Sequence, residues 1–178
     1  MRIRQARTAE AEAIHSIVSA YAAQGILLPR TRQQIERGIR DYLVAVEAGR
    51  VKGCVALESY GPGLAEIRSL AVAADARGTG IGGKLLDAAM KQASRRKIAR
   101  LLAVTGSGRF FERHGFRRMR AGMPAEKIAR DCSQCSKAAT CRLEALAMDL
   151  APDLAPAHSL LHVLQPARVP RAAQPVPA

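Results

Sequence analysis

The sequence contains no tryptophan, and aromatic residues make up only 3% of its 178 residues. A hydrophobic core must therefore be built from alanine, leucine, isoleucine and valine. The shortage of aromatic side chains also argues against binding of single-stranded nucleic acid by base stacking, and no motif typical of a nucleic-acid-binding domain is present.

Long apolar runs are also missing. No segment approaches the roughly 18 apolar residues that read as a membrane-spanning helix, and the N-terminus lacks the pattern of a secretory signal. We therefore expect a cytoplasmic protein that does not contact a membrane. In that reducing compartment its four cysteines should remain thiols.

Acidic residues are few. The chain has 15 of them against 28 Lys and Arg, which gives a net charge of +13. Such an excess predicts an anionic partner without identifying it. An anionic cofactor together with an acidic small substrate fits as well as nucleic acid does, and solubility alone is a further explanation.

Hydrophobic periodicity predicts an α/β fold with a mixed, mostly antiparallel sheet flanked by helices. Strands are predicted at residues 3–6, 42–47, 50–59, 64–72, 100–105, from 116 onward, and at 143–150. Helices are predicted at residues 8–25, 31–42, 81–97, 108–114 and 123–131. From residue 151 the chain is rich in Ala and Pro, so we expect one domain over residues 1–150 and a disordered tail over 151–178.

A glycine-rich turn follows the predicted strand 64–72. Arg77 precedes residues 78–83, which read Gly-Thr-Gly-Ile-Gly-Gly and lead into a helix. Glycines allow backbone N–H groups to approach a phosphate, and a helix N-terminus adds about half a positive charge. The turn therefore predicts a pyrophosphate site. A dinucleotide fold fits poorly because residues 97–105 contain no acidic residue, and a Walker loop lacks its Gly-Lys-Ser/Thr. A turn that serves only as a helix entry remains an alternative.

The pattern Arg77-x-x-Gly80-x-Gly82 after an apolar strand, together with Phe-Phe-Glu-Arg-His-Gly-Phe at 110–116, resembles the acetyl-CoA signature of the GNAT acetyltransferase superfamily. Further segments narrow the resemblance to the short, single-domain bacterial N-acetylglutamate synthases. They are residues 25–30, 53–57 and 65–72, Met-Pro at 123–124 and the cysteine segment 131–141. The resemblance covers about residues 1–150. It implies transfer of acetyl from acetyl-CoA to the α-amino group of L-glutamate, the first step of arginine biosynthesis. Two-domain synthases carry an amino-acid-kinase domain ahead of this one, and we expect neither that domain nor arginine feedback through it.

The resemblance also implies where the cofactor binds. Backbone N–H groups near Ala71 and Val72 would polarise the thioester carbonyl, and Val72 would pair with the pantetheine arm. Phe110 and Phe111 would wall the channel. The pyrophosphate would lie on the segment that contains Arg77, Gly78, Thr79, Gly80, Ile81 and Gly82.

Glu66 is the candidate general base, acting directly or through a water, because a carboxylate on a central strand is unexpected unless it is paired or used. The alternative is an edge residue that pairs with Arg68 or Arg30. Many GNAT enzymes protonate the leaving thiolate with a tyrosine, which is absent from this position. Thr105 matches a hydroxyl residue proposed for this step in the synthases, and Ser107 is next in line. Ordinary strand packing is the alternative for Thr105.

Glutamate presents two carboxylates, so its site needs two cationic anchors. Arg30 matches the family arginine that holds the α-carboxylate, and a guanidinium suits that bidentate contact. The backbone at Ser69 assists. Lys127 is the candidate for the side-chain carboxylate, with Arg68 or Lys137 as substitutes.

Three cysteines form a C-x2-C-x5-C pattern. Two cysteines separated by two residues begin many zinc sites, but a second pair at the usual spacing is missing. We therefore expect no metal, and the only candidate ligands are Cys132, Cys135 and Cys141. Cys54 lies in a predicted strand and is expected in the core.

Two other functions remain open. The same fold also fits an enzyme for a different acceptor, such as another amino acid, a polyamine or a protein amine. The net charge and the missing tyrosine also fit a non-catalytic module that senses CoA or binds nucleic acid. A homodimer is a further open alternative.

Overall fold

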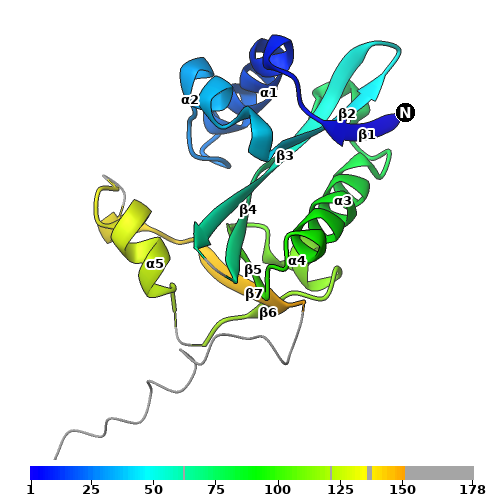
Figure 1. Cartoon of the computed structure of the whole chain (residues 1–178). Coiled ribbons are helices and arrows are strands. Elements are labelled where there is room, and N and C mark those ends of the chain that lie inside the picture. Colours follow the sequence, from blue (N-terminus) through cyan, green and yellow to red (C-terminus); the bar gives the residue numbers. More distant parts are fainter. Residues whose placement is uncertain (62, 121, 136–137, 151–178) are drawn as a thin grey trace, which may run out of the picture.

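The computed structural model describes residues 1–61, 63–120, 122–135 and 138–150, which form one mixed sheet with helices on both faces (Figure 1). The predicted tail and Lys137 lie outside the described residues. The strands are β1 Arg2–Gln5, β2 Tyr42–Glu47, β3 Arg50–Gly61, β4 Leu64–Val72, β5 Arg100–Thr105, β6 Arg117–Arg118 and β7 Glu144–Asp149. The α-helices are α1 Ala11–Ala22, α2 Arg32–Arg37, α3 Ile81–Arg95, α4 Gly108–Glu112 and α5 Ala125–Lys127. Short 3-10 turns span Thr8–Glu10, Ile39–Asp41, Ala74–Ala76 and Ala138–Thr140, and a π-helical turn spans Ile128–Cys132.

The sheet has the order β1-β2-β3-β4-β5-β7-β6. Neighbouring strands run antiparallel except β4 and β5, which run parallel and are joined by the crossover through α3. This confirms the predicted mixed, mostly antiparallel sheet. The β2–β3 hairpin turns at Ala48 and Gly49, whose positive φ values of 46° and 75° suit a type I′ turn.

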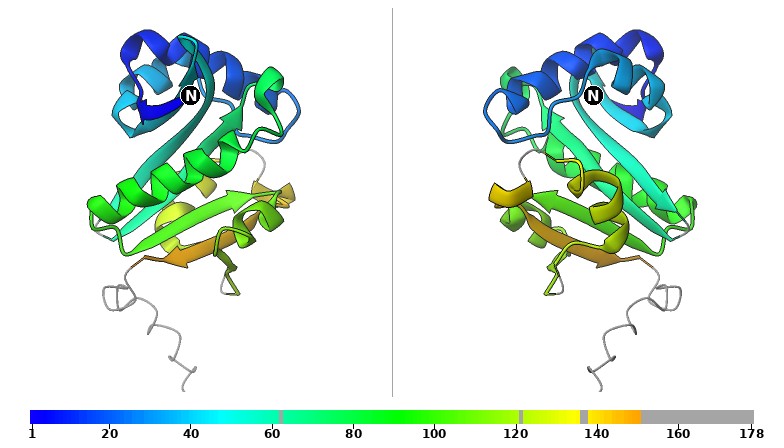
Figure 2. Two further views of the ribbon diagram at one scale, coloured as in Figure 1. Left: turned by 90° about the vertical axis from the view of Figure 1, so that its right-hand side faces the viewer. Right: turned by 90° about the vertical axis from the view of Figure 1, so that its left-hand side faces the viewer.

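Helix α3 covers one face of the sheet, and α1, α2 and α5 lie on the other (Figures 1 and 2). The buried residues of α3 recur at helical spacing and form one wall of the larger core. They are Ile81, Leu85, Leu86, Ala89 and Ala93. A second core lies under α1 around Ile14 and Val18. As the composition predicts, nearly all of the largest fully buried side chains are Ile, Leu and Val.

Two details of the fold bear on the site. A capping box starts α2: the Thr31 hydroxyl accepts from the Gln34 N–H at 3.2 Å, and the Gln34 side chain accepts from the Thr31 N–H at 2.9 Å. The box fixes the position of Arg30, the preceding residue.

The helix predicted over residues 123–131 is instead a short α5 followed directly by the π-helical turn. Both Lys127 and Asp131 reach the sheet from this segment.

The predicted boundaries were wrong elsewhere. Helix α1 ends at Ala22, before Gly25, and α2 ends at Arg37, where Gly38 follows. The strand expected from residue 116 is only the pair Arg117–Arg118. Across residues 1–61, 63–120, 122–135 and 138–150, no helix combines the length and apolar character needed to cross a bilayer.

Gly53 allows β3, β4 and α3 to approach one another closely. A Cβ at this position would lie 2.9 Å from the Ala71 carbonyl oxygen, 3.0 Å from Leu85 and 3.2 Å from Ile81. The contact with Ala71 is to backbone, which cannot rotate away. Gly53 therefore helps to set α3 beside the end of β4.

Replacing Gly53 by Ala is expected to lower the free energy of unfolding by about 1–3 kcal/mol, the usual cost of overpacking a core. Urea unfolding monitored by circular dichroism measures the change. Gly38→Ala is the matched control, because its φ of −96° is ordinary and its Cβ would meet its nearest neighbour at 3.5 Å. Equal stability of the Gly53→Ala variant and the wild type would contradict the prediction.

Candidate active site

Strands β4 and β5 are paired over only part of their length. The pairs join Leu64–Ile67 to Arg100–Ala103, although β4 continues to Val72 and β5 to Thr105. Next to the last pair β4 bulges at Ser69, where φ is 49° and the register with β3 shifts. Bulges bend a strand, and the two strands part beyond this one. The resulting opening exposes a strand edge with which an extended ligand can pair.

Val72 presents its N–H group to this opening. The N–H of the next residue, Ala73, donates to the Lys52 carbonyl oxygen on β3 at 2.8 Å. Backbone N–H groups alternate in direction along a strand, so the Val72 N–H points the other way. The same alternation turns the Ala71 N–H toward β3. Of the two residues predicted to polarise the thioester carbonyl, only Val72 has this N–H orientation.

The glycine turn forms the predicted cradle of N–H groups. Gly78 and Gly80 have φ values of 77° and 79°, which favour glycine. The Thr79 hydroxyl donates to the Ala76 carbonyl oxygen at 2.7 Å and closes the turn. The N–H of Lys84 donates to the Gly80 carbonyl oxygen at 3.2 Å, which is the first backbone hydrogen bond of helix α3. The N–H groups before it have no acceptor within the helix, and together with the helix dipole they have the geometry typical of an anion site.

Arg77 is held by a residue that the sequence analysis did not assign to the site. Its Nε donates to the Tyr21 hydroxyl at 3.1 Å, and its guanidinium lies 4.9 Å from the centre of that ring. The Tyr21 hydroxyl in turn donates to the Val72 carbonyl oxygen at 2.8 Å. Tyr21 on α1 thus joins the arginine before the glycine turn to the end of β4.

The two phenylalanines of α4 lie in different places. A Cβ on Gly82 would be 3.8 Å from both the Phe110 ring and Val72, so Phe110 stands between the glycine turn and the end of β4. Phe111 is 6% exposed and packs edge-to-face against Phe116 in the core. Phe110 has the position predicted for a channel wall, whereas Phe111 is a core residue.

Thr105 lies two residues beyond Ala103, the last residue of β5 that pairs with β4, and on its other side it still pairs with Glu144 of β7. It faces Val72 across the opening. Its Oγ1 accepts from the Ser107 N–H at 2.9 Å. The hydroxyl proton of Thr105 is therefore available for donation. This geometry is compatible with the predicted role of Thr105 as a proton donor.

Five side chains form an ion cluster on the face of β4 opposite α3: Tyr60, Glu66, Arg68, Lys127 and Asp131. Lys127 Nζ lies 2.8 Å from Glu66 Oε2 and 2.9 Å from Asp131 Oδ2. Arg68 lies 2.9 Å from the same Glu66 oxygen and 2.5 Å from the same Asp131 oxygen. The Tyr60 hydroxyl contacts both carboxylates. Glu66 and Lys127 are only 3% and 4% exposed, so a carboxylate and an ammonium are buried here as a pair.

The ion cluster bears on two predicted roles. The alternative for Glu66 is an edge residue paired with Arg68 or Arg30. Glu66 does pair with Arg68, but its strand β4 lies in the middle of the sheet and not at an edge. Its Oε2 accepts from three side chains, whereas among the described residues Oε1 accepts only from Lys127, at 3.0 Å. Oε1 thus retains a lone pair for a proton. Lys127, predicted to hold a substrate carboxylate, already has two carboxylate partners.

Asp131 and Tyr60 show the electrostatic coupling of the ion cluster. Burial by itself raises the pKa of Asp131, but hydrogen bonds from Tyr60 and Lys127 and the charge of Arg68 outweigh it and lower that pKa. Burial and the neighbouring Glu66 raise the pKa of Tyr60. Asp131 is therefore a carboxylate and Tyr60 a neutral donor at neutral pH.

Arg30, Ser69 and Arg68 all act on the hydroxyl of Tyr42. Burial raises the pKa of the Tyr42 hydroxyl, and a hydrogen bond with Ser69 and the charges of Arg30 and Arg68 only partly offset that rise. Within the described part of the chain, no carboxylate forms an ion pair with Arg30. The predicted substrate residues Arg30 and Ser69 are thus both within electrostatic reach of Tyr42.

The four cysteines are free thiols. Cys54 is fully buried, and burial raises its pKa to about 12. Among the described residues, no group of three or more His, Cys, Asp and Glu side chains could hold a metal ion. This search includes Cys132, Cys135 and Cys141.

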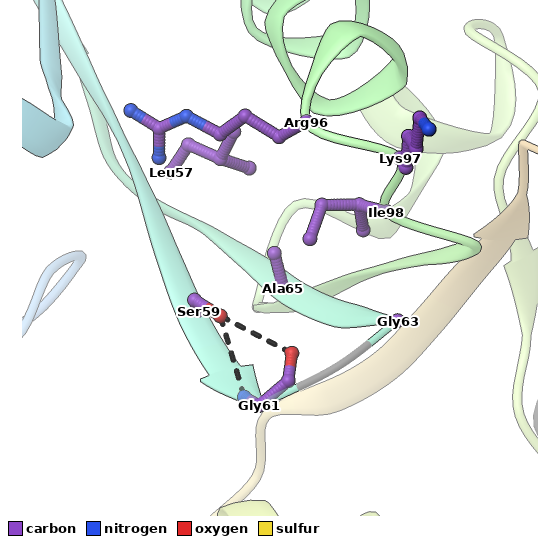
Figure 3. A pocket seen from close by; sticks show the side chains of 8 residues that line it. All are labelled: Leu57, Ser59, Gly61, Gly63, Ala65, Arg96, Lys97 and Ile98. Atoms are coloured by element: carbon purple, nitrogen blue, oxygen red, sulfur yellow. Dashed lines mark hydrogen bonds between the residues drawn. The ribbon is translucent and has the colours of Figure 1, made fainter.

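A separate pocket of about 400 Å³ lies between the β3–β4 hairpin and the C-terminal end of α3 (Figure 3). Its lining residues are Leu57, Ser59, Gly61, Gly63, Ala65, Arg96, Lys97 and Ile98. It contains no residue of the predicted site, and Arg96 already donates to the Asp41 carboxylate and the Arg40 carbonyl oxygen. The candidate site is the opening between β4 and β5, with the ion cluster beside it.

Known proteins resemble this chain in sequence and in fold. A family model described as acetyltransferase (GNAT) domain matches residues 38–118. An uncharacterized N-acetyltransferase from Chlorobaculum tepidum is 40% identical over 139 residues, which cover 78% of this chain and 90% of that protein. An amino-acid acetyltransferase from Mycobacterium tuberculosis is 34% identical over 117 residues, which cover 64% of this chain and 67% of that protein. Among solved structures, N-acetylglutamate synthase from Neisseria gonorrhoeae, complexed with coenzyme A and N-acetyl-glutamate, matches with a TM-score of 0.74 and 28% identity. The match covers 84% of this chain and 35% of that one.

Proposed function

Because this chain belongs to the GNAT acetyltransferase family, we propose that it transfers the acetyl group of acetyl-CoA to the α-amino group of L-glutamate. The observation that carries the proposal is the course of β4. Along one continuous segment, Glu66 is followed by the opening at Val72 and then by the glycine turn. A base, a carbonyl-binding N–H and a phosphate cradle thus lie in the order that an extended acetyl-CoA requires.

In this proposal the pantetheine arm pairs with the free edge of β4, and the pyrophosphate binds the N–H groups of the glycine turn. Arg77 exchanges its contact with Tyr21 for a phosphate oxygen, since a guanidinium prefers an anion to a hydroxyl. Phe110 lines the bend between the arm and the pyrophosphate. These roles assign the opening and the turn to one ligand.

Acetyl transfer breaks the C–S bond of the thioester and forms an amide C–N bond. The acceptor amine loses a proton to Glu66 Oε1, directly or through a water, and its nitrogen attacks the carbonyl carbon. The Val72 N–H stabilises the oxyanion of the tetrahedral intermediate. Thr105 donates its hydroxyl proton to the departing thiolate and regains one from solvent. A thiolate is a good leaving group, so this last contribution is small.

Glutamate is proposed as the acceptor because of the cations beside Glu66. Arg30 has no carboxylate partner among the described residues, and its charge, like the side chain of Ser69, acts on the Tyr42 hydroxyl. An unpaired guanidinium at this place suits the α-carboxylate of an amino acid. Further support comes from the relatives, which include an amino-acid acetyltransferase from Mycobacterium tuberculosis and an N-acetylglutamate synthase from Neisseria gonorrhoeae.

Arg30→Ala tests the acceptor. Acetyl-CoA consumption is measured with each of the amino acids, with spermidine and with a peptide that has a free N-terminal amine. The wild type should prefer glutamate. The variant should raise the KM for glutamate about 10- to 100-fold, because a hydrogen-bonded charge contact contributes about 1.5–3 kcal/mol. The KM for acetyl-CoA should remain unchanged.

Arg32→Ala is the matched control, since Arg32 lies two residues further along and pairs with Glu36 and Glu12 on the surface. An unchanged glutamate KM in the Arg30 variant, or a preference of the wild type for a different amine, would contradict the proposed acceptor.

A further inference from the structure

Asp131 holds a position in the ion cluster that resembles that of a bound ligand. A single oxygen, Oδ2, accepts from Tyr60 at 2.6 Å, Arg68 at 2.5 Å and Lys127 at 2.9 Å. Three convergent donors, two of them cationic, make a complete seat for one carboxylate oxygen. We name Tyr60, Arg68 and Lys127 together the carboxylate seat.

The charges of the ion cluster are balanced when Asp131 is in place and the adjoining pair of Glu58 and Arg130 is counted with it. Arg68, Lys127 and Arg130 supply three positive charges, and Glu58, Glu66 and Asp131 supply three negative ones. An incoming carboxylate added to this set would be a buried charge without a partner, which is costly. One that replaces Asp131 would preserve the balance.

Asp131 is the member of the ion cluster best placed to leave. Its side chain is 22% exposed, compared with 4% for the Glu66 side chain and 5% for that of Lys127. It is carried by the short segment of α5 and the π-helical turn, in which Lys127 is the only buried residue. Ile128 on the same segment is 47% exposed. Rotation of the Asp131 carboxylate toward solvent therefore uncovers little apolar surface.

We propose that the carboxylate seat binds the side-chain carboxylate of the acceptor, and that Asp131 fills the seat when no acceptor is present. Asp131 is then an internal competitor that lowers acceptor affinity and keeps Arg68 and Lys127 paired in the empty enzyme. The acceptor class is an amino acid with an acidic side chain. This inference rests on the proposed function, because it names what the second carboxylate of glutamate contacts.

Asp131→Asn tests the competition. The amide retains the shape of Asp131 but removes its charge, so the seat is left with an excess of positive charge. The KM for glutamate should fall about fivefold or more, and glutarate, which has two carboxylates and no amine, should bind at least fivefold more tightly in calorimetry. Glu126→Gln is the matched control, because Glu126 is an exposed carboxylate on the same segment, and it should change neither value.

The glutarate measurement separates the two proposals. If the wild type fails to acetylate glutamate, the proposed acceptor is wrong, but tighter glutarate binding by Asp131→Asn would still support the seat. If glutarate binds the folded variant no more tightly than the wild type, the seat is overturned whatever the acceptor. Asp131→Ser provides the same measurement should the Asn variant not fold, and a higher glutamate KM in either folded variant would assign Asp131 a purely structural role.

Discussion

Glu66→Gln is expected to lower kcat by about two to four orders of magnitude, the usual contribution of a general base. The amide has nearly the shape of the carboxylate but cannot take a proton from the amine. Steady-state rates with saturating acetyl-CoA and glutamate measure the loss.

The substitution also removes ion pairs with Arg68 and Lys127, so a structural effect must be separated from a chemical one. Glu58→Gln is the control, because Glu58 lies opposite Glu66 in the register and pairs with the same Arg68 at 3.3 Å. Its rate should stay within about threefold of the wild type. A Glu66→Gln variant that is folded and retains its rate would remove Glu66 as the base.

Gly80→Val is expected to weaken acetyl-CoA binding about 10- to 100-fold. Valine strongly disfavours the φ of 79° that Gly80 adopts. The chain can relieve the strain only by rotating the peptide groups of the turn, and the N–H groups of Ile81 and Gly82 then no longer converge on one anion. Calorimetric titration with CoA measures the loss, which corresponds to about one hydrogen bond to a charged group.

Gly49→Val is the control for backbone strain alone. Gly49 has a φ of 75° in the β2–β3 turn, and a Cβ at either glycine would meet nothing within 4 Å. Both variants should lose similar stability, but only the Gly80 variant should lose CoA affinity. Equal CoA binding by the two variants would show that the glycine turn is only a helix entry.

The parts of the site that follow from local sequence were predicted. Glycine at 78 and 80 requires a particular backbone conformation, and an apolar strand before it and an amphipathic helix after it fix the surroundings of the turn. Thr31 and Gln34 identify the start of α2 in the same local way. Such features depend on residues a few positions apart, and one sequence is enough to recognise them.

The partners of the functional side chains depend on tertiary contacts and could not be read from one sequence. Tyr21 has helical spacing that predicts only a core residue, but its hydroxyl contacts Val72 and Arg77. Lys127 was placed near the acceptor, yet nothing local shows that it pairs with Glu66 on β4. The one usable signal for Tyr21 is chemical, since a half-buried tyrosine hydroxyl usually finds a hydrogen-bond partner.

The parting of β4 and β5 also matters for aggregation. Unpaired strand edges recruit strands of other chains, and proteins blunt them with short lengths and charge. Both outermost strands do so here: β1 carries Arg2 and Arg4, and β6 consists of Arg117 and Arg118 alone. The edge at Val72 lies inside the sheet, with β5 facing it. An extended ligand can therefore pair with the backbone at this edge, whereas a strand of another protein chain is blocked from it by β5.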